Sequence, residues 1–378
     1  MSDFITEIKI NKVRHLENID IKLGETKKHL ILTGKNGCGK TSVLEELNKF
    51  FENKFIDKKI SEQDAMKQYN TLYPIFNKEV LYRDDIFKPE TEYIYAFFRD
   101  KRRKEPMIES KGAKKLELSK DKTAKLNDYF LQYLVNLNID LLFAKVDNKK
   151  ENIKALEKWF LNFNNIMKQI FDDSFQITLD RTDYTFWIER DNREPFTFNT
   201  LSAGYRAIID IVSEIIMKIS TTKSKSFNCK GIVLIDEIDI HLHVELQKDI
   251  LPMLISFFPN IQFIVTTHSP FVLSSIENSV IYDLERKEQV NGERLYIASY
   301  KDIVKNYFEI DNEASQILED MIIQYENFTK IFVDNGLDIE DEKELLHLDI
   351  KLDEIAPMMT QNIYLRFKEA QDRIREDD

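Results

Sequence analysis

The chain has 378 residues, 43% of them hydrophobic and 11% aromatic, which is enough to bury a large core and excludes a disordered or collagen-like chain. The formal net charge is −12, but residues 309–378 carry 20 acidic and 7 basic side chains, so the overall charge does not exclude a basic surface elsewhere. Two cysteines without metal-ligand spacing exclude a disulfide framework and a zinc site.

The start of the chain gives no sign of a membrane location. No stretch reaches the roughly 18 uninterrupted apolar residues of a spanning helix. The first residues, MSDFITEIKI, include Asp3 and Glu7, where a signal peptide needs an apolar run. We therefore expect a cytoplasmic protein with no membrane partner.

The first predicted elements are three strands and a helix. ITEIKINKV and IDIKL alternate and predict two strands, and the mostly apolar KHLILTG predicts a third strand that is buried on both faces. KTSVLEELNKFFE follows with apolar residues at helical spacing. A glycine-rich loop thus joins a buried strand to a helix.

From residue 55 to residue 170 the pattern is largely helical, interrupted by the strand-like YIYAFF at 93–98. The segments LNDYFLQYLVNLNIDLLF and NIKALEKWFLNFNNIMKQIF predict two amphipathic helices. A strand pair is predicted next, in SFQITLDRTDYTFWIERDN.

Strands and helices alternate further along the chain. A helix is predicted to open at Leu201 in LSAGYRAIIDIVSEIIMKI, followed by a buried strand in GIVLIDEID, a helix in LQKDILPMLISFF and a second buried strand in IQFIVTTHSP. This alternation predicts an α/β fold with a mostly parallel sheet covered on both sides. N-terminal antiparallel strands, a helical insertion and an acidic helical C-terminal tail complete the expected architecture.

Residues 34–41, GKNGCGKT, match the pattern GxxxxGK[ST] between a buried strand and a helix, which is the context of a phosphate-binding loop. In such a loop, backbone N–H groups surround the phosphates and larger side chains would block the approach. Lys40 would supply positive charge, and the Thr41 hydroxyl would bind Mg²⁺. Cys38 stands at an unconstrained position, where a redox role and a neutral filler are the alternatives.

Two carboxylates, Asp236 and Glu237, end the apolar strand IVLI. The carboxyl ends of parallel strands are where ligands of α/β folds bind. We expect Asp236 to hold the water shell of Mg²⁺ and Glu237 to orient or deprotonate an attacking water. The alternative is a strand that ends in acids only because it reaches solvent.

Two further segments are predicted at ligand-facing ends. Ser202 and Gly204 open a helix, where the hydroxyl and the N–H can bind a second anion, although an ordinary helix cap is the alternative. His268, at the end of the strand IQFIVTT, can contact a γ-phosphate or the attacking water, and a satisfied structural histidine is the alternative.

Together these motifs resemble those of the ABC-type ATPases, in the branch that includes SMC, RecF and OLD-like proteins. GKNGCGKTS resembles Walker A, IVLIDEID Walker B, LSAGYR the signature motif, THSP the switch histidine, and DEIDIHLH the D-loop. The resemblance covers about residues 1–280 apart from the insertion. It implies a P-loop nucleotide-binding domain in two parts, 1–54 and 171–300, with a mainly helical insertion at 55–170 and an acidic helical region at 301–378.

The resemblance also implies the site residues and an ATP-bridged homodimer or higher homo-oligomer. Ser202 and Gly204 would contact ATP held by the partner protomer, so that ATP binding closes the dimer and hydrolysis opens it. The implied catalytic residues are Glu237, His268 and Lys40, and the implied metal ligands are Thr41 and Asp236. ATP would contact Asn36, Gly37, Cys38, Gly39, Lys40, Thr41, Ser42, Arg14, Ser202, Gly204 and Asp239.

The sequence departs from the family pattern in two places. Ala203 and Tyr205 stand where the signature motif more often has glycine and glutamine. No glutamine stands out as the Q-loop residue, for which Gln63 and Gln68 are the candidates. Arg14, in VRHLENIDIKL, is either the arginine that approaches the nucleotide in this family or a plain surface arginine.

By resemblance, stand-alone ATPases of this branch occur in bacterial defence systems beside a separate nuclease or toxin, with Septu and retron-associated ATPases as examples. We therefore expect a Mg²⁺-dependent ATPase that senses or scaffolds and controls a separate effector in anti-phage defence. The alternatives are an ATP-dependent DNA clamp in repair or recombination and a non-hydrolysing ATP-bound module. Residues 99–125, with 11 basic and 5 acidic side chains, make nucleic acid a further candidate partner, although a solvated surface is the simpler interpretation.

Overall fold

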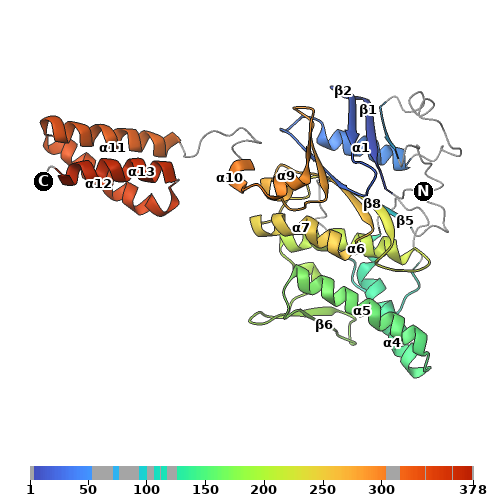
Figure 1. The fold of residues 1–378 in the computed structure, drawn as a ribbon. Helices are drawn as coiled ribbons and strands as arrows, with labels where there is room; N and C mark the ends of the chain where they lie inside the picture. Colours follow the sequence, from blue (N-terminus) through green and yellow to red (C-terminus); the bar gives the residue numbers. More distant parts are fainter. Residues whose placement is uncertain are drawn as a thin grey trace. The chain divides into compact units, whose positions relative to one another are not determined.

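The computed structural model describes residues 4–52, 71–75, 93–99, 106–110, 112–116, 126–303, 316–336, 338–359 and 361–376. The chain divides into two compact units, Met1–Tyr300 and Lys301–Asp378 (Figure 1). Each unit has a hydrophobic core of its own.

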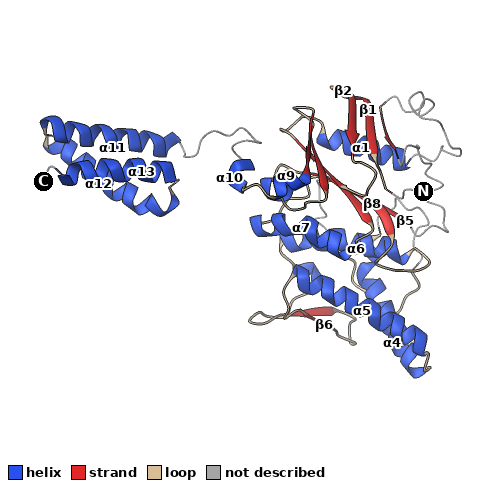
Figure 2. Ribbon diagram, in the orientation of Figure 1, coloured by secondary structure: helices blue, strands red, loops and turns tan. Residues whose placement is uncertain are grey.

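A six-stranded sheet lies at the centre of the first unit and contains β3 (His29–Thr33), β5 (Tyr93–Phe98), β8 (Lys230–Ile235), β9 (Ile261–Thr266), β10 (Ser279–Asp283) and β11 (Glu288–Asn291). The strand order is β11-β10-β3-β9-β8-β5, and every neighbouring pair is parallel except β10 and β11. Figure 2 shows the strands of this unit in red and its helices in blue. Strands β3 and β9 are buried along their whole length, which explains their apolar sequences. The predicted α/β fold with a mostly parallel sheet is confirmed.

A smaller antiparallel sheet is built from β1 (Glu7–Val13), β2 (Leu16–Lys22) and β4 (Leu72–Ile75), in the order β2-β1-β4. The hairpin between β1 and β2 closes with Val13 opposite Leu16, so Arg14 and His15 form its two-residue turn. Arg14 has a φ of +56°, in the left-handed region that such tight hairpin turns require. The core side of this sheet carries Ile8, Ile10, Ile19 and Ile21, all buried.

Two long helices border the main sheet, α1 (Lys40–Glu52) and α6 (Ala203–Ser220). Buried leucines of α1 share one core cluster with the antiparallel sheet and with β3 and β8. Helix α6 packs against β5 and against α7 (Val244–Phe257). Nearly every residue of α6 is buried, including the charged side chains of Asp210, Glu214 and Lys218.

Two strands come from the interval 55–170, which the sequence predicts to be a mainly helical insertion. β4 pairs with β1, and β5 pairs with β8 at the edge of the main sheet. β4 is short and includes Pro74, which suits an edge strand. For the same reasons its sequence does not show a clear strand pattern. Gln63 and Gln68 lie outside the described residues.

The same interval forms a helical hairpin of α4 (Phe130–Val146) and α5 (Lys150–Ile170), preceded by the short helix η1 (Asn127–Tyr129). The antiparallel pair β6 (Gln176–Leu179) and β7 (Phe186–Glu189) follows. Trp159 of α5 stacks on Phe163 with ring centroids 5.4 Å apart. The next segment is η2 (Phe198–Thr200), which leads into α6.

The described residues of unit Lys301–Asp378 form three longer helices, α11 (Gln316–Asn335), α12 (Ile339–Ile355) and α13 (Gln361–Glu376). Its core includes Tyr325, Leu352 and Phe367, each fully buried. Arg366 of α13 donates hydrogen bonds to Glu326 and Glu319 of α11, which links two helices of this acidic unit. No helix in the described part of the chain is long and apolar enough to cross a membrane.

Candidate functional site

The glycine-rich loop at residues 34–41 joins the carboxyl end of β3 to the first turn of α1. Gly34, Gly37 and Gly39 have φ values of +127°, +86° and +102°, which residues with side chains rarely adopt. A Cβ atom on Gly34 would lie 2.8 Å from the Sγ atom of Cys38. The backbone therefore favours glycine at all three positions, and at Gly34 the available space does so as well.

Lys40 is the first residue of α1 and is buried. Its ammonium group donates hydrogen bonds to the carbonyl oxygens of Gly34 at 2.8 Å and Lys35 at 3.2 Å. The lysine thus folds back over its own loop, and an incoming phosphate would compete with two carbonyl oxygens for it. Of its neighbours, Thr41 is exposed and Ser42 is buried.

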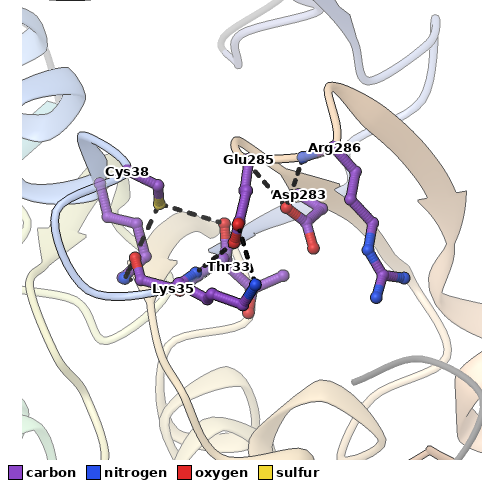
Figure 3. Close-up of polar contacts among 8 residues, drawn as sticks. Thr33, Lys35, Cys38, Asp283, Glu285 and Arg286 are labelled. Carbon is purple, nitrogen blue, oxygen red and sulfur yellow. Dashed lines mark hydrogen bonds and ion pairs between the residues drawn. The ribbon is translucent and has the colours of Figure 1, made fainter. Parts of the chain in front are cut away.

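The segment after β10 braces the loop, as Figure 3 shows. Glu285 accepts a hydrogen bond from the backbone N–H of Lys35 at 3.2 Å and forms an ion pair with its ammonium group at 3.1 Å. The Lys35 hydrogen bond lowers the pKa of Glu285. The carboxylate of Asp283 accepts hydrogen bonds from the backbone N–H groups of Glu285 and Arg286, and this orients Glu285. The sequence did not predict this contact between Lys35 and Glu285, because the two residues are 250 positions apart in the chain.

Cys38 lies inside the loop and is buried. Its Sγ atom is 3.9 Å from the ammonium group of Lys40 and 4.0 Å from the carbonyl oxygen of Thr33. Burial raises the pKa of the thiol and outweighs the opposite effect of Lys40. Because the thiolate is the reactive form, this environment favours a packing role over a redox role.

The two acids after β8 are held by the neighbouring strand β9. The hydroxyl of Thr266 donates to Asp236 Oδ1 at 2.6 Å and accepts the backbone N–H of Glu237 at 2.7 Å. Asp236 is fully buried, whereas Glu237 is partly exposed and has a φ of +47°. A positive φ is uncommon for a residue with a side chain and turns the chain sharply after the strand.

His268 follows β9, two residues after Thr266. Its Nε2 atom is buried and has no hydrogen-bond partner among the described residues. Burial lowers the pKa of His268, and the charge of Lys40 acts in the same direction, so the imidazole is neutral near pH 7. Because β9 pairs in parallel with β3, His268 and the glycine-rich loop follow the same edge of the sheet. The adjacent Thr267 donates a 2.5 Å hydrogen bond to Asp239.

Ser202 is the N-cap of α6, so the helix begins one residue later than the serine that the sequence singled out. Ser202 is exposed, and its hydroxyl makes no capping hydrogen bond within the helix. A Cβ atom on Gly204 would lie 3.1 Å from the carbonyl oxygen of His241, in the segment after Glu237. No hydrogen bond among the described residues joins Ser202 or Gly204 to the phosphate loop of the same chain.

Arg14 is exposed at the tip of the β1–β2 hairpin, and this tip touches the phosphate loop. A Cβ atom on Gly39 would lie 2.9 Å from Leu16 Cδ1 and 3.7 Å from His15 Cε1. The hairpin therefore carries Arg14 to the edge of the loop. Sequence reasoning selected Arg14 but missed His15 and Leu16, whose importance comes only from this contact.

The side chains at this site suit Mg²⁺ better than a metal that is held by three or more protein ligands. No group of three or more His, Cys, Asp or Glu side chains suited to a metal ion occurs within the described ranges. Mg²⁺ needs few protein ligands, because it keeps several waters and binds substrate phosphates. Thr41, on the first turn of α1, and Asp236, at the end of β8, are the residues that would hold it.

The chain is similar in sequence to a known protein family and to several known proteins. A family model described as "AAA domain, putative AbiEii toxin, Type IV TA system" matches residues 73–274. The Retron Vc95 probable ATPase of Vibrio cholerae serotype O1 biovar El Tor is 29% identical over 55% of this chain and 46% of its own length. The Septu protein PtuA of Bacillus mycoides (strain KBAB4) is 28% identical over 76% of this chain and 41% of its own length.

A second Septu protein PtuA, from Bacillus thuringiensis, is 24% identical over 92% of this chain and 93% of its own length. By contrast, the chain spans less than half the length of the retron relative and of the Bacillus mycoides relative. Among solved structures, the SmcHead bound to the C-winged helix domain of ScpA is similar with a TM-score of 0.43 and 12% identity, over 77% of this chain and 99% of that chain.

Proposed function

Because the chain belongs to the family of AAA domains described as putative AbiEii toxin, Type IV TA system, we propose that it binds and hydrolyses ATP with Mg²⁺ and controls a separate effector in anti-phage defence. The observation that carries the ATPase part is that Lys40, Glu237 and His268 follow the carboxyl ends of β3, β8 and β9, which are parallel neighbours and so end at one edge of the main sheet. Phosphoryl transfer needs such positioning and charge more than covalent chemistry from the protein.

Each residue has a distinct role in this proposal. The N–H groups of residues 36–42 surround the phosphates, and Lys40 leaves the carbonyl oxygens of its own loop to neutralise them. Mg²⁺ supplies charge stabilisation when it is held by Thr41 and Asp236. Glu237 accepts the proton of the attacking water, and neutral His268 contacts the γ-phosphate or that water through Nε2.

We further propose that two protomers sandwich ATP. The support is the exposed Ser202, whose hydroxyl does not cap its own helix and which makes no hydrogen bond to the phosphate loop of the same chain among the described residues. A helix N-terminus with such a serine is suited to bind an anion presented by another protomer. Asp239, held by Thr267, would lie beside this contact.

Control of an effector rests on the relatives named as retron ATPase and Septu PtuA and on the acidic C-terminal unit. Three apolar side chains of α12 are exposed in this unit, namely Ile339, Leu346 and Ile350. Exposed apolar side chains on a charged helix suit a protein partner. Most of the basic stretch 99–125 lies outside the described residues, so nucleic-acid binding is tested directly, by adding DNA to the ATPase assay.

The ATPase proposal is tested by phosphate release from Lys40→Ala and Glu237→Gln, with Lys49→Ala as the matched control. Lys49 lies on the same helix but is exposed and pairs with Glu46. We expect both site variants to lose turnover and the control to keep it. Wild-type turnover in both site variants would reject the proposal.

The sandwich is tested by mixing two inactive variants, Lys40→Ala and Ser202→Ala. A mixed dimer contains one site with both intact halves, so about a quarter of wild-type turnover should return in a two-fold symmetric assembly. A mixture as inactive as its components would contradict the sandwich. Copurification from native cells followed by a nuclease assay tests the effector, and recovery of the ATPase alone argues against it.

A further inference from the structure

Residues 106–110 and 112–116, here called the strap, form hydrogen bonds with the side-chain amides of Asn199, Gln132 and Asn136. The most telling of these is Asn199, in η2 immediately before α6. Its Oδ1 atom accepts the backbone N–H of Met107 at 2.7 Å, and its Nδ2 donates to the carbonyl oxygen of Met107 at 3.1 Å. Asn199 thus pairs with the peptide groups of the strap as a neighbouring strand would.

The backbone of Asn199 is tied to the start of α6. Arg206 donates from Nη2 to the carbonyl oxygen of Asn199 at 2.7 Å, and its own N–H donates to the carbonyl oxygen of Ser202 at 2.9 Å. Thr197 and Thr200 close the same turn with reciprocal hydrogen bonds. The direction in which Ser202 faces therefore depends on a turn that is fastened to the strap.

The other end of the strap is fastened to α4 by the same chemistry. Gln132 donates to the carbonyl oxygen of Gly112 at 2.6 Å. Asn136 accepts the N–H of Lys114 at 3.3 Å and donates to its carbonyl oxygen at 2.8 Å. Asn136 and Asn199 are both half-buried and hold one strap residue in the same way, but only Asn199 adjoins Ser202.

We propose that Asn199 is a positioning residue, which fixes Ser202 against the strap so that it can reach ATP held by a partner protomer. This inference rests on the ATP sandwich proposed above. It makes a specific statement about that sandwich: the strap controls the signature half of each site, whereas the phosphate-loop half is independent of it. A ligand that displaces the strap would then slow hydrolysis without weakening the binding of ATP to Lys40.

The test compares Asn199→Ala with Asn136→Ala, which removes the same pair of hydrogen bonds from the strap at its other end. Loss of one or two such bonds corresponds to a change of about tenfold. We expect kcat to fall about tenfold in Asn199→Ala, with the ATP dissociation constant measured by calorimetry unchanged. Asn136→Ala should keep the wild-type kcat. Equal kcat values in the two variants would overturn the proposal.

Subunit mixing separates positioning from a general loss of structure. Asn199→Ala mixed with Lys40→Ala should regain activity, because the mixed dimer joins an intact phosphate loop to an intact Ser202. Asn199→Ala mixed with Ser202→Ala should regain none, since both signature halves are damaged. Recovery in the second mixture, or none in the first, would overturn the proposal.

Two controls keep the outcome interpretable. If Asn199→Ala does not fold, Asn199→Asp replaces it, because it keeps the acceptor for Met107 N–H and loses the donor to the carbonyl oxygen; the same results are expected. If Lys40→Ala and Ser202→Ala fail to complement each other, the sandwich itself is wrong. If they complement but Asn199 variants behave like wild type, only the positioning role is wrong.

Discussion

The hydroxyl of Thr266 donates a 2.6 Å hydrogen bond to the buried carboxylate of Asp236. The same hydroxyl accepts the backbone N–H of Glu237, so one side chain of β9 orients both acids at the end of β8. The acids of the proposed site are thus positioned by a residue on the strand that leads to His268.

We expect Thr266→Val to lower both stability and turnover, because valine keeps the shape but removes the donor to Asp236 and the acceptor for Glu237 N–H. Loss of hydrogen bonds to a buried carboxylate costs about 1–3 kcal/mol in the free energy of unfolding. Chemical denaturation and phosphate release measure the two effects. Thr266→Ser, which keeps the hydroxyl, should stay close to wild type in turnover; a matching loss in the serine variant would contradict the explanation.

Leu16→Ala should weaken ATP binding because Leu16 supports Gly39 of the phosphate loop from behind. Leu16 is fully buried, and such a truncation costs about 2–5 kcal/mol of stability. Leu23→Ala is the matched control, since Leu23 is equally buried but follows the far end of β2. We expect similar losses of stability and a raised ATP dissociation constant only for Leu16→Ala, measured by calorimetry. Equal ATP affinities would argue against a support role.

Glu214 of α6 carries a buried carboxylate that accepts the N–H groups of Leu126 and Asn127, both at 2.7 Å, and faces Lys218 at 3.5 Å. Glu214→Ala removes a buried charge partner and two acceptors, which should lower the free energy of unfolding by about 3–5 kcal/mol. Tryptophan fluorescence in urea reports it, because Trp159 and Trp187 both lie in the first unit. Glu214→Gln keeps an acceptor for the N–H groups and should lose less stability. An equal loss in both variants would mean that the ion pair with Lys218, and not the two hydrogen bonds, accounts for the effect.

The free energy of unfolding should decrease as the pH is lowered, because of His29. Burial, assisted by the charge of Lys27, lowers the pKa of His29 to about 3, and its Nδ1 accepts the N–H of Phe263. Below the ordinary pKa of about 6.5 the unfolded chain binds a proton that the folded chain refuses. Between pH 6.5 and pH 3 this residue alone therefore reduces the free energy of unfolding by about 1.4 kcal/mol per pH unit.

His29→Asn provides the control, because its amide oxygen can accept the same N–H but does not titrate. Urea denaturation of the two proteins across this range should show a shallower pH dependence in the variant, by one proton. Identical slopes would mean that His29 is already accessible to protons in the folded state. Both proteins should be similarly stable at pH 8.

Features that depend on residues close together in the chain could be predicted from the sequence, whereas features that depend on distant residues could not. The phosphate loop, Asp236 and Glu237 were predicted because each lies in a short segment whose backbone and polarity are set by neighbours in the chain. β4 was not predicted, because four residues with a proline carry too little periodicity. Thr266 stood in the predicted strand IQFIVTT, but its hydrogen bond to Asp236 depends on the pairing of β9 with β8.

Residue order alone determined the local features on which the proposed chemistry depends: glycines that permit a tight loop, a lysine and a threonine at a helix start, and acids at the end of an apolar strand. Tertiary structure decided which distant groups support that chemistry, namely Glu285 on Lys35, Leu16 behind Gly39, and Asn199 on the strap. The physical reason is that local patterns specify backbone angles and burial, whereas contacts between remote segments exist only after the sheets and helices have packed.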